Sequence, residues 1–458
     1  MPTAAHAFDT TLIARYDTRA PRYTSYPTAD RFHPGVGAGA YQRALRTRQR
    51  APLSLYLHIP FCPSPCFYCG CHREITRQSG PIQRYLDSLE QEIALQAAMI
   101  DAPGPVVQIH FGGGSPTFLS APQLAAIVAA LHARFQVAPE VEMGIEADPR
   151  NLDASGVHAL HDIGFNRLSV GVQDFDGRVQ TAINRRQSYA QTEAVVGAAR
   201  AAGFHSISLD LIYGLPHQHA KGFEVTLERV LTLDPDRLAL YSYAHLPDRF
   251  PAQRRFPAEA LPGPEEKLEL LAAAVERLEA AGYVHIGMDH FAKAHDPLTQ
   301  ALRRGDLHRN FQGYSTLGGC DLMGLGVSAI SHVGKHYAQN TKSLPEYHSS
   351  IAERRLPVNR GIVLTREDQL RQAVIQALMC QGRVCYRTIR EYHGIDFPAY
   401  FAAELRMLAP AVADGLVRLG PDALEVTPDG RYLLRALAAP FDTYLQEKAS
   451  PAEHARLI

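Results

Sequence analysis

Short apolar segments that alternate with helical patterns constrain the fold of this chain more than any other feature. Six of these segments are rich in β-branched and aromatic residues. They are expected as strands at 53–59, 106–110, 141–147, 167–172, 206–213 and 237–243. Stretches with helical periodicity, such as 121–135 and 189–202, lie between them. Because strands that alternate with helices form parallel sheets, we expect an α/β protein of barrel type.

Polar and glycine residues stand at the carboxyl ends of these strands. Glycines 112–114 follow the second strand, Glu146 ends the third, Gln173 follows the fourth, and Asp210 lies in the fifth. In a parallel α/β barrel the carboxyl ends of the strands carry the active site. We therefore expect these residues to meet at one mouth, where the glycines expose backbone N–H and C=O groups to a ligand.

A cluster of cysteines follows the first strand. The chain has seven cysteines, and Cys62, Cys66, Cys69 and Cys71 fall within ten residues, the first three with the spacing C-x3-C-x2-C. An odd number of clustered cysteines does not resemble a disulfide framework. Three thiolates fit a four-iron cluster with one open iron, and a zinc site is the alternative, although no second cysteine pair completes it. The other three cysteines are expected as buried thiols.

The charge balance excludes several classes of protein. There are 46 Lys+Arg against 47 Asp+Glu, so the formal net charge is −1. A general nucleic-acid binder shows a basic excess, so we expect no nucleic-acid partner. No apolar run reaches the ~18 residues of a membrane helix, and the polar N-terminus lacks the apolar centre of a signal peptide. We expect a cytoplasmic protein with no membrane partner.

The pattern divides the chain into three parts. Residues 1–50 are expected as an N-terminal arm and lead-in helix, 51–360 as the barrel, and 361–458 as a helical, winged-helix-like domain with a hairpin near 416–434. In the arm, arginines alternate with aromatic residues. They are Arg15, Arg19, Arg22 and Arg31 among Tyr16, Tyr23, Tyr26 and Phe32.

Several motifs resemble those of a known family. They include YTSYPT at 23–28, LSLYLHIPFC at 53–62, CGC at 69–71, FGGGSPT, IEADPR, RLSVGVQDF and DLIYGLP. The cysteine loop resembles that of radical S-adenosylmethionine (SAM) enzymes, and the set is similar to the oxygen-independent coproporphyrinogen III oxidases. This resemblance implies an incomplete (β/α)6 TIM-like barrel with a mostly helical C-terminal domain.

The resemblance also implies cofactors and their ligands. Cys62, Cys66 and Cys69 would hold a [4Fe–4S] cluster whose open iron binds SAM, and a second SAM would bind beside the first. The residues implied for the first SAM are Tyr56, Gly113, Glu146 and Ile330. Those implied for the second are Tyr68, Gly114, Ser115, Gln173, Arg185, Asp210 and Ala244. Tyr68 replaces a common Phe and Ser115 a common Thr. A fourth ligand would close the open iron, so Cys71 is expected to face the substrate as a catalytic residue.

The implied reaction is oxidative decarboxylation of two propionate side chains of coproporphyrinogen III to vinyl groups, which gives protoporphyrinogen IX in heme biosynthesis. The arginines of the arm would then suit the four carboxylates of the substrate; a disordered basic tail is the alternative. An electron donor such as a flavodoxin or ferredoxin is implied, and we expect a monomer. Competing functions are a heme-binding chaperone paralogue and a radical SAM methyltransferase. The chaperones typically lack the CGC cysteine and the YTSYPT arm, both of which are present here.

Overall fold

A 12-stranded sheet organises the computed structural model, which describes residues 10–447. The six expected strands are adjacent and parallel in its centre. They are β1 (Leu53–Ile59), β4 (Val106–Gly113), β5 (Val137–Ala147), β6 (Arg167–Gln173), β7 (Ser206–Tyr213) and β8 (Arg237–Ser242). In the described part of the chain the two edge strands of the sheet do not pair with each other, so the barrel is incomplete, as expected.

The sheet extends beyond these six strands on both sides. A seventh parallel strand, β13 (Asp321–Leu325), lies in a glycine-rich segment and pairs with β1. Antiparallel strands continue the sheet from there: β14 (Ile330–Val333), β15 (His336–Asn340) and β16 (Val358–Val363). The other edge is formed by β10 (His290–Lys293) and β9 (Tyr283–Gly287).

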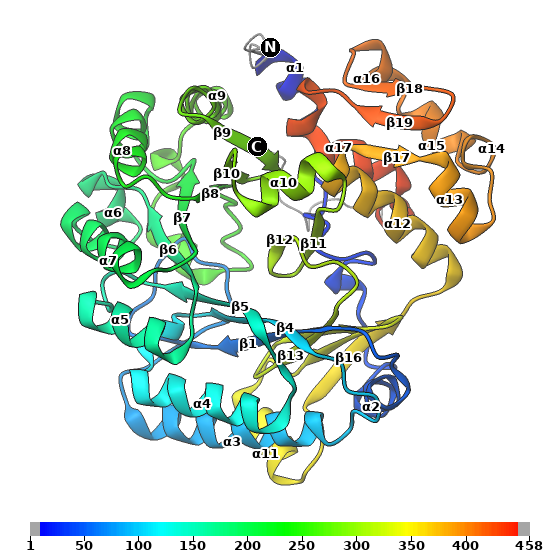
Figure 1. The fold of residues 1–458 in the computed structure, drawn as a ribbon. Coiled ribbons are helices and arrows are strands. Elements are labelled where there is room, and N and C mark those ends of the chain that lie inside the picture. Colours follow the sequence, from blue (N-terminus) through cyan, green and yellow to red (C-terminus); the bar gives the residue numbers. More distant parts are fainter. Residues whose placement is uncertain (1–9, 448–458) are drawn as a thin grey trace.

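Helices cover the outer face of the parallel strands (Figure 1). They are α3 (Ser79–Ala97), α4 (Ala121–Arg134), α5 (Ala154–Ile163), α7 (Tyr189–Ala202), α8 (Ala220–Thr232) and α9 (Pro264–Ala280). Each helix buries an apolar stripe against the strands; in α3 the stripe includes Tyr85, Leu89 and Ile93. Because helices cover one face and side chains fill the other, β1 is buried almost throughout.

The C-terminal region is mostly helical and stands beside the barrel (Figure 1). Its helices include α12 (Arg366–Gln381), α13 (Tyr386–His393) and α17 (Leu434–Ala438). A small antiparallel sheet accompanies them, formed by β17 (Arg383–Cys385), β19 (Ala423–Val426) and β18 (Val417–Leu419). The hairpin predicted near 416–434 is therefore present, as β18 and β19.

The N-terminal arm packs against the C-terminal region. The arm runs from α1 (Thr10–Arg15) to α2 (Ala38–Thr47), and three of its arginines bond to residues distant in the sequence. Arg15 is paired with Asp414, Arg22 with Asp289, and Arg31 donates to the carbonyl of Tyr444. These three arginines thus connect parts of the fold, and the contact of the arm with the substrate carboxylates stays a prediction. Residues 1–9 and 448–458 of the expected terminal domains lie outside the described residues.

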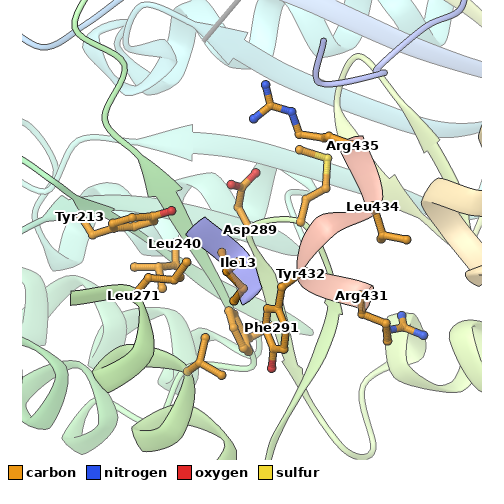
Figure 2. A pocket seen from close by; sticks show the side chains of 12 residues that line it. Ile13, Tyr213, Leu240, Leu271, Asp289, Phe291, Arg431, Tyr432, Leu434 and Arg435 are labelled. Atoms are coloured by element: carbon orange, nitrogen blue, oxygen red, sulfur yellow. The ribbon is translucent and has the colours of Figure 1, made fainter. Parts of the chain in front are cut away.

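A cavity of about 40 Å³ lies where the arm, the barrel and the C-terminal region meet. Figure 2 shows Ile13 of α1, Tyr213 of β7 and Leu434 of α17 around it, together with Asp289. Sites for cofactor-sized ligands usually measure ~300–1,000 Å³, so this cavity is an interface gap and is too small to be the active site. No helix of the described residues is long and apolar enough to cross a membrane.

Candidate active site at the cysteine loop

The carboxyl ends of the parallel strands bring the polar residues of the sequence pattern together. Tyr56 of β1 lies opposite His110 of β4, and Glu146 of β5 lies opposite Ser169 of β6. Ser169 donates to the carboxylate of Asp210 on β7 at 3.3 Å. Strand order and register therefore place Tyr56, Glu146 and Asp210 along one rim, as the barrel prediction required.

The cysteine loop begins at this rim. Its first part, β2 (Phe61–Cys62), pairs with β3 (Glu74–Ile75), which closes the loop at its base. Cys66 is buried, and Cys62 and Cys69 are half-buried. Arg73 folds back onto the loop, and its Nη1 donates to the carbonyl of Cys69 at 2.9 Å. The loop is thus held in shape by its own arginine as well as by its three prolines.

A pair of arginines and one aspartate surround Cys66. The guanidinium of Arg150 lies 3.6 Å from Cys66 Sγ, and that of Arg185 lies 3.7 Å from it. Asp148 accepts from both, at 2.6 Å from Arg150 and 3.0 Å from Arg185. Burial raises the pKa of Asp148, but the hydrogen bond from Arg150 and the charge of Arg185 outweigh it and lower the pKa. Two fixed cations therefore face the sulfur of Cys66.

Several groups of the fold hold the guanidinium of Arg185 in place. This residue was implied as a contact of the second SAM, and in the structure it bonds Cys66, Asp148 and the carbonyl of Gly171. Its Nε is buried without a hydrogen-bond partner among the described residues. One donor of Arg185 is thus available to a ligand, while the others hold the guanidinium in place.

The glycine segment allows neighbouring groups to approach its backbone closely, and its amides are used in bonds within the protein. Gly113 has φ +121°, and a Cβ there would lie 2.7 Å from the imidazole of His58. Its amide donates to Glu146 at 3.1 Å, and the amide of Gly114 donates to the carbonyl of Ile59 at 2.8 Å. The expectation that these N–H groups are exposed to a ligand is therefore wrong. The adjacent Ser115 is buried, and its hydroxyl has no partner in the described part of the chain.

Two carboxylates face the same region of the barrel mouth. Glu146 accepts from Gly113, and its other oxygen lies 3.6 Å from His110 Nε2. Burial raises the pKa of Glu146, but the hydrogen bonds from His110 and Gly113 lower it overall. Asp210 lacks such donors apart from Ser169, so burial and the charge of Glu146 raise its pKa to about 7. A cationic ligand between the two carboxylates would relieve this repulsion.

Gln253 joins two of the residues implied for the second SAM. Its Nε2 donates to the carbonyl of Tyr68 at 3.1 Å and to that of Ala244 at 3.2 Å. Gln173 has a left-handed backbone conformation with φ +67°, which is uncommon for a residue with a side chain. Gln253 thus fixes the backbone at Tyr68 and Ala244. Tyr68 also packs against a small apolar cluster.

Ile330 and Cys71 complete the predicted set. Ile330 is on β14, directly against Gly324, the partner of Tyr56 in the sheet. Cys71 is exposed, and its thiol hydrogen-bonds the sulfur of Cys69, which lowers the pKa of Cys69 to about 6. Of the other three cysteines only Cys380 is buried; Cys320 and Cys385 are half-buried, contrary to the expectation for them.

Behind the loop, a buried carboxylate supports the first strand. Glu92 of α3 is fully buried and accepts from the Tyr347 hydroxyl, the Gly326 amide, Asn340 and Gln96, at 2.7–2.9 Å. Next to it, the hydroxyl of Tyr85 donates to the carbonyl of His58 at 2.6 Å. His58 itself is satisfied, with its ring nitrogens 3.1 Å from the Tyr56 hydroxyl and 3.0 Å from the His72 carbonyl. It is a packing histidine.

These residues fit an iron–sulfur cluster and a polar, cationic ligand. Three cysteines on one loop are the donor set of such a cluster, and cations beside Cys66 offset its negative charge. No three His, Cys, Asp or Glu side chains of residues 10–447 converge as the ligands of a single metal ion do. The partnerless Ser115 hydroxyl and Arg185 Nε offer donors to a ligand that the glycine segment allows to come close.

Sequence reasoning missed four residues of this site. Asp148 and Arg150 lie in the IEADPR motif, which was noted as a resemblance but not assigned a role. Arg73 follows CGC directly, and its position after the cysteines was the available signal. Gln253 lies in a proline-rich stretch without periodicity, and nothing in the sequence indicates that its side chain is buried.

Comparison with known proteins places this geometry in context. Residues 56–230 match the radical SAM superfamily model, and residues 364–433 match the HemN C-terminal domain model. The chain is 47% identical over 442 residues to oxygen-independent coproporphyrinogen III oxidase of Pseudomonas aeruginosa, covering 96% of each chain. It is 45% identical to that of Escherichia coli over 98% of each chain. The solved Escherichia coli structure, described as a radical SAM enzyme, superposes with TM-score 0.92 over 96% of this chain and 99% of that one.

Proposed function

The chain belongs to the family of oxygen-independent coproporphyrinogen III oxidases, and from that premise we propose the roles of its site residues in the reaction. The enzyme converts two propionate side chains of coproporphyrinogen III to vinyl groups and so forms protoporphyrinogen IX in heme biosynthesis. Cys62, Cys66 and Cys69 would hold a [4Fe–4S] cluster, which with SAM would supply the one-electron chemistry that removes a hydrogen atom from each propionate. The observation that carries this function is the three-cysteine loop at the barrel mouth of a chain similar to these oxidases from end to end.

We propose that Cys62, Cys66 and Cys69 hold the cluster. Their loop is closed at its base by β2 and β3 and stiffened by Arg73. Arg150 and Arg185 place positive charge beside Cys66, which would offset the negative charge of a bound cluster. Cys71 remains outside the ligand set, and we propose that this exposed thiol faces the substrate.

The mouth would then bind SAM through its carboxylates and its close-packed backbone. We propose Tyr56, Gly113, Glu146 and Ile330 for the first SAM. The proposed second SAM would contact Tyr68, Gly114, Ser115, Gln173, Arg185, Asp210 and Ala244. Glu146 and Asp210 suit the cationic end of SAM, because both face the mouth and Asp210 makes no ion pair within residues 10–447, so that burial and the charge of Glu146 raise its pKa. Ser115 Oγ and Arg185 Nε suit a carboxylate, because both are buried donors without partners in the described residues.

The remaining proposals concern the setting of the enzyme. We also propose a monomer as the working unit. All seven cysteines are free, which fits the reducing cytoplasm. A small acidic carrier such as a flavodoxin or ferredoxin is proposed as the electron donor.

An isotope experiment tests the proposed hydrogen transfer. The reconstituted enzyme is incubated under anaerobic conditions with SAM, a reductant and coproporphyrinogen III deuterated at the propionate β-carbons. Deuterium should appear in 5′-deoxyadenosine, as measured by mass spectrometry. Deuterium found only in water, with normal product formation, would contradict hydrogen abstraction by the adenosyl group. The heme-chaperone alternative would instead show stable heme binding and no conversion of the porphyrinogen.

A further inference from the structure

The cysteine loop and two segments that contact it carry a strong local excess of positive charge. We call residues 63–77, 178–186 and 249–256 together the cysteine-loop face. These segments hold eight arginines and one carboxylate, in a chain whose net charge is −1. The excess is therefore a property of this face and not of the whole protein.

Direct contacts join the three segments around the loop. The amide of Phe67 donates to the carbonyl of Ile183 at 2.9 Å, and Asn184 donates to the carbonyl of Pro65 at 2.7 Å. The guanidinium of Arg255 lies over the ring of Phe67, 5.8 Å from its centroid. The charges of all three segments thus surround residues that adjoin the proposed ligand Cys66.

The arginines of this face differ in what they bind. Arg185 turns inward to Cys66 and Asp148, whereas its neighbour Arg186 is exposed. Arg77 is exposed and donates from Nε to the carbonyl of Pro63 at 3.2 Å. Arg186, Arg255 and Arg77 make no ion pair within residues 10–447, so their charges are directed to solvent. Asp148, the nearest buried carboxylate, is already bonded to Arg150 and Arg185.

One exposed apolar side chain belongs to the first of these three segments. Ile75 is 46% exposed, although it is paired in the sheet with Cys62, a proposed cluster ligand. An exposed apolar centre with a basic rim is a typical protein interaction surface. Because that centre adjoins a cluster ligand, a partner seated on it would bring its own redox centre close to the cluster.

We propose that the cysteine-loop face is the docking surface for an acidic one-electron carrier protein, with Ile75 at its centre and Arg77, Arg186 and Arg255 at its rim. This inference rests on the proposed function, because it assigns the entry point of the electron that the reaction requires. One electron leaves the reduced centre of the carrier, which becomes oxidised by one electron, and the cluster is reduced by that electron. No bond forms or breaks at the surface.

The test compares the holoenzyme with its Arg186→Glu, Arg255→Glu double variant, using an oxidised bacterial flavodoxin as the probe. Calorimetric titration should show a Kd raised about 10-fold in the variant at low ionic strength, and the difference should shrink as salt is added. Stopped-flow reduction of the cluster by flavodoxin hydroquinone should slow by a similar factor. Turnover driven by dithionite should stay unchanged, with the iron content verified for each protein.

Matched controls are Arg46→Glu on α2 and Arg418→Glu on β18, two exposed arginines outside the cysteine-loop face that should leave flavodoxin binding unchanged. Equal binding by the double variant and the unsubstituted enzyme would overturn the proposal. So would a raised KM for coproporphyrinogen III under dithionite, which would assign the face to the anionic substrate. Failure of the unsubstituted holoenzyme to turn over with dithionite would instead contradict the proposed function itself.

Discussion

Arg185 places its Nη1 3.7 Å from the Sγ of Cys66, and the same nitrogen lies 3.0 Å from Asp148. This contact joins two strand ends of the barrel to the cysteine loop, because Arg185 follows β6 and α6 (Gly177–Ala182) whereas Asp148 follows β5. The cation is held before any ligand binds, so its charge acts on the cluster ligand at a fixed position.

Replacing this guanidinium should change the redox potential of the cluster. Arg185→Gln removes a positive charge that stabilises the more negative, reduced state, and Asp148 keeps its own negative charge. We expect the midpoint potential to fall on the order of 60 mV, since 59 mV corresponds to about 1.4 kcal/mol for one electron. A potentiometric titration followed by electron paramagnetic resonance measures it. Arg134→Gln, an exposed change on α4, should leave the potential unaltered, and an unchanged potential in Arg185→Gln would contradict the role of this contact.

The glycine segment supports the cysteine loop by close contact. A Cβ at Gly114 would lie 2.6 Å from the carbonyl oxygen of Pro60 and 2.8 Å from that of Phe61, so Gly114→Ala must displace the backbone that leads into Cys62. We expect reduced iron and sulfide content after reconstitution and a loss of stability of about 1–3 kcal/mol.

Gly197→Ala is the matched control for Gly114→Ala. A Cβ at Gly197, inside α7, meets nothing within 4 Å, so this change should be neutral or stabilise by up to about 1 kcal/mol. Full iron content in Gly114→Ala would show that the segment tolerates a side chain and that close packing is not its role.

The buried carboxylate of Glu92 should be sensitive to loss of charge. Glu92→Gln presents an NH2 group to a ring of four donors, which leaves buried donors without an acceptor. We expect a loss of about 2–4 kcal/mol in the free energy of unfolding, measured by denaturant titration. Glu90→Gln, an exposed change on the same helix, should cost little. Similar stability of the two variants would mean that the network adds nothing to the fold.

Asp210 predicts a pH dependence of stability in the cluster-free protein. Its pKa is raised to about 7, so the folded state holds a proton that the unfolded state releases near pH 4. The burial of Asp210 therefore does not lower the free energy of unfolding below pH 4. It lowers this free energy increasingly between pH 4 and 7, and by the full amount above pH 7. Asp210→Asn should remove this cost, by up to about 4 kcal/mol above pH 7.

Thermal unfolding of the two proteins at several pH values measures this difference. The gain in Tm for Asp210→Asn should disappear near pH 4, and Asp162→Asn, an exposed change on α5, should show no such pattern. A gain that is independent of pH would contradict a raised pKa of Asp210.

The parallel strands were predictable because each is a buried apolar run whose pattern repeats. Residues 53–59 and 206–213 match β1 and β7 fully, and the other four strands differ from the prediction only at their ends. β13 was not predictable in the same way, because it is short and Gly324 interrupts its apolar pattern. Gly324 lies in β13 for a packing reason that only the fold reveals, since a Cβ there would lie 2.5 Å from the carbonyl of Ile330.

In the site, too, local sequence patterns were predictable and long-range contacts were not. The spacing of Cys62, Cys66 and Cys69 is local, so it was evident from the sequence. The placement of Arg185 on Cys66 depends on contact between residues 119 positions apart. The role of Asp148 likewise depends on its long-range ion pair with Arg185. Gln253 is buried and hydrogen-bonds the Tyr68 carbonyl, and no sequence periodicity predicts this contact.

The most direct measurement is product formation by the anaerobically reconstituted enzyme with SAM, a low-potential reductant and coproporphyrinogen III. The account predicts protoporphyrinogen IX together with 5′-deoxyadenosine, two molecules of the latter for each porphyrinogen because two propionates react. Substitution of Cys66 by serine should abolish both products. If the cluster-loaded enzyme forms neither product, the account of this protein as an oxygen-independent coproporphyrinogen III oxidase is contradicted.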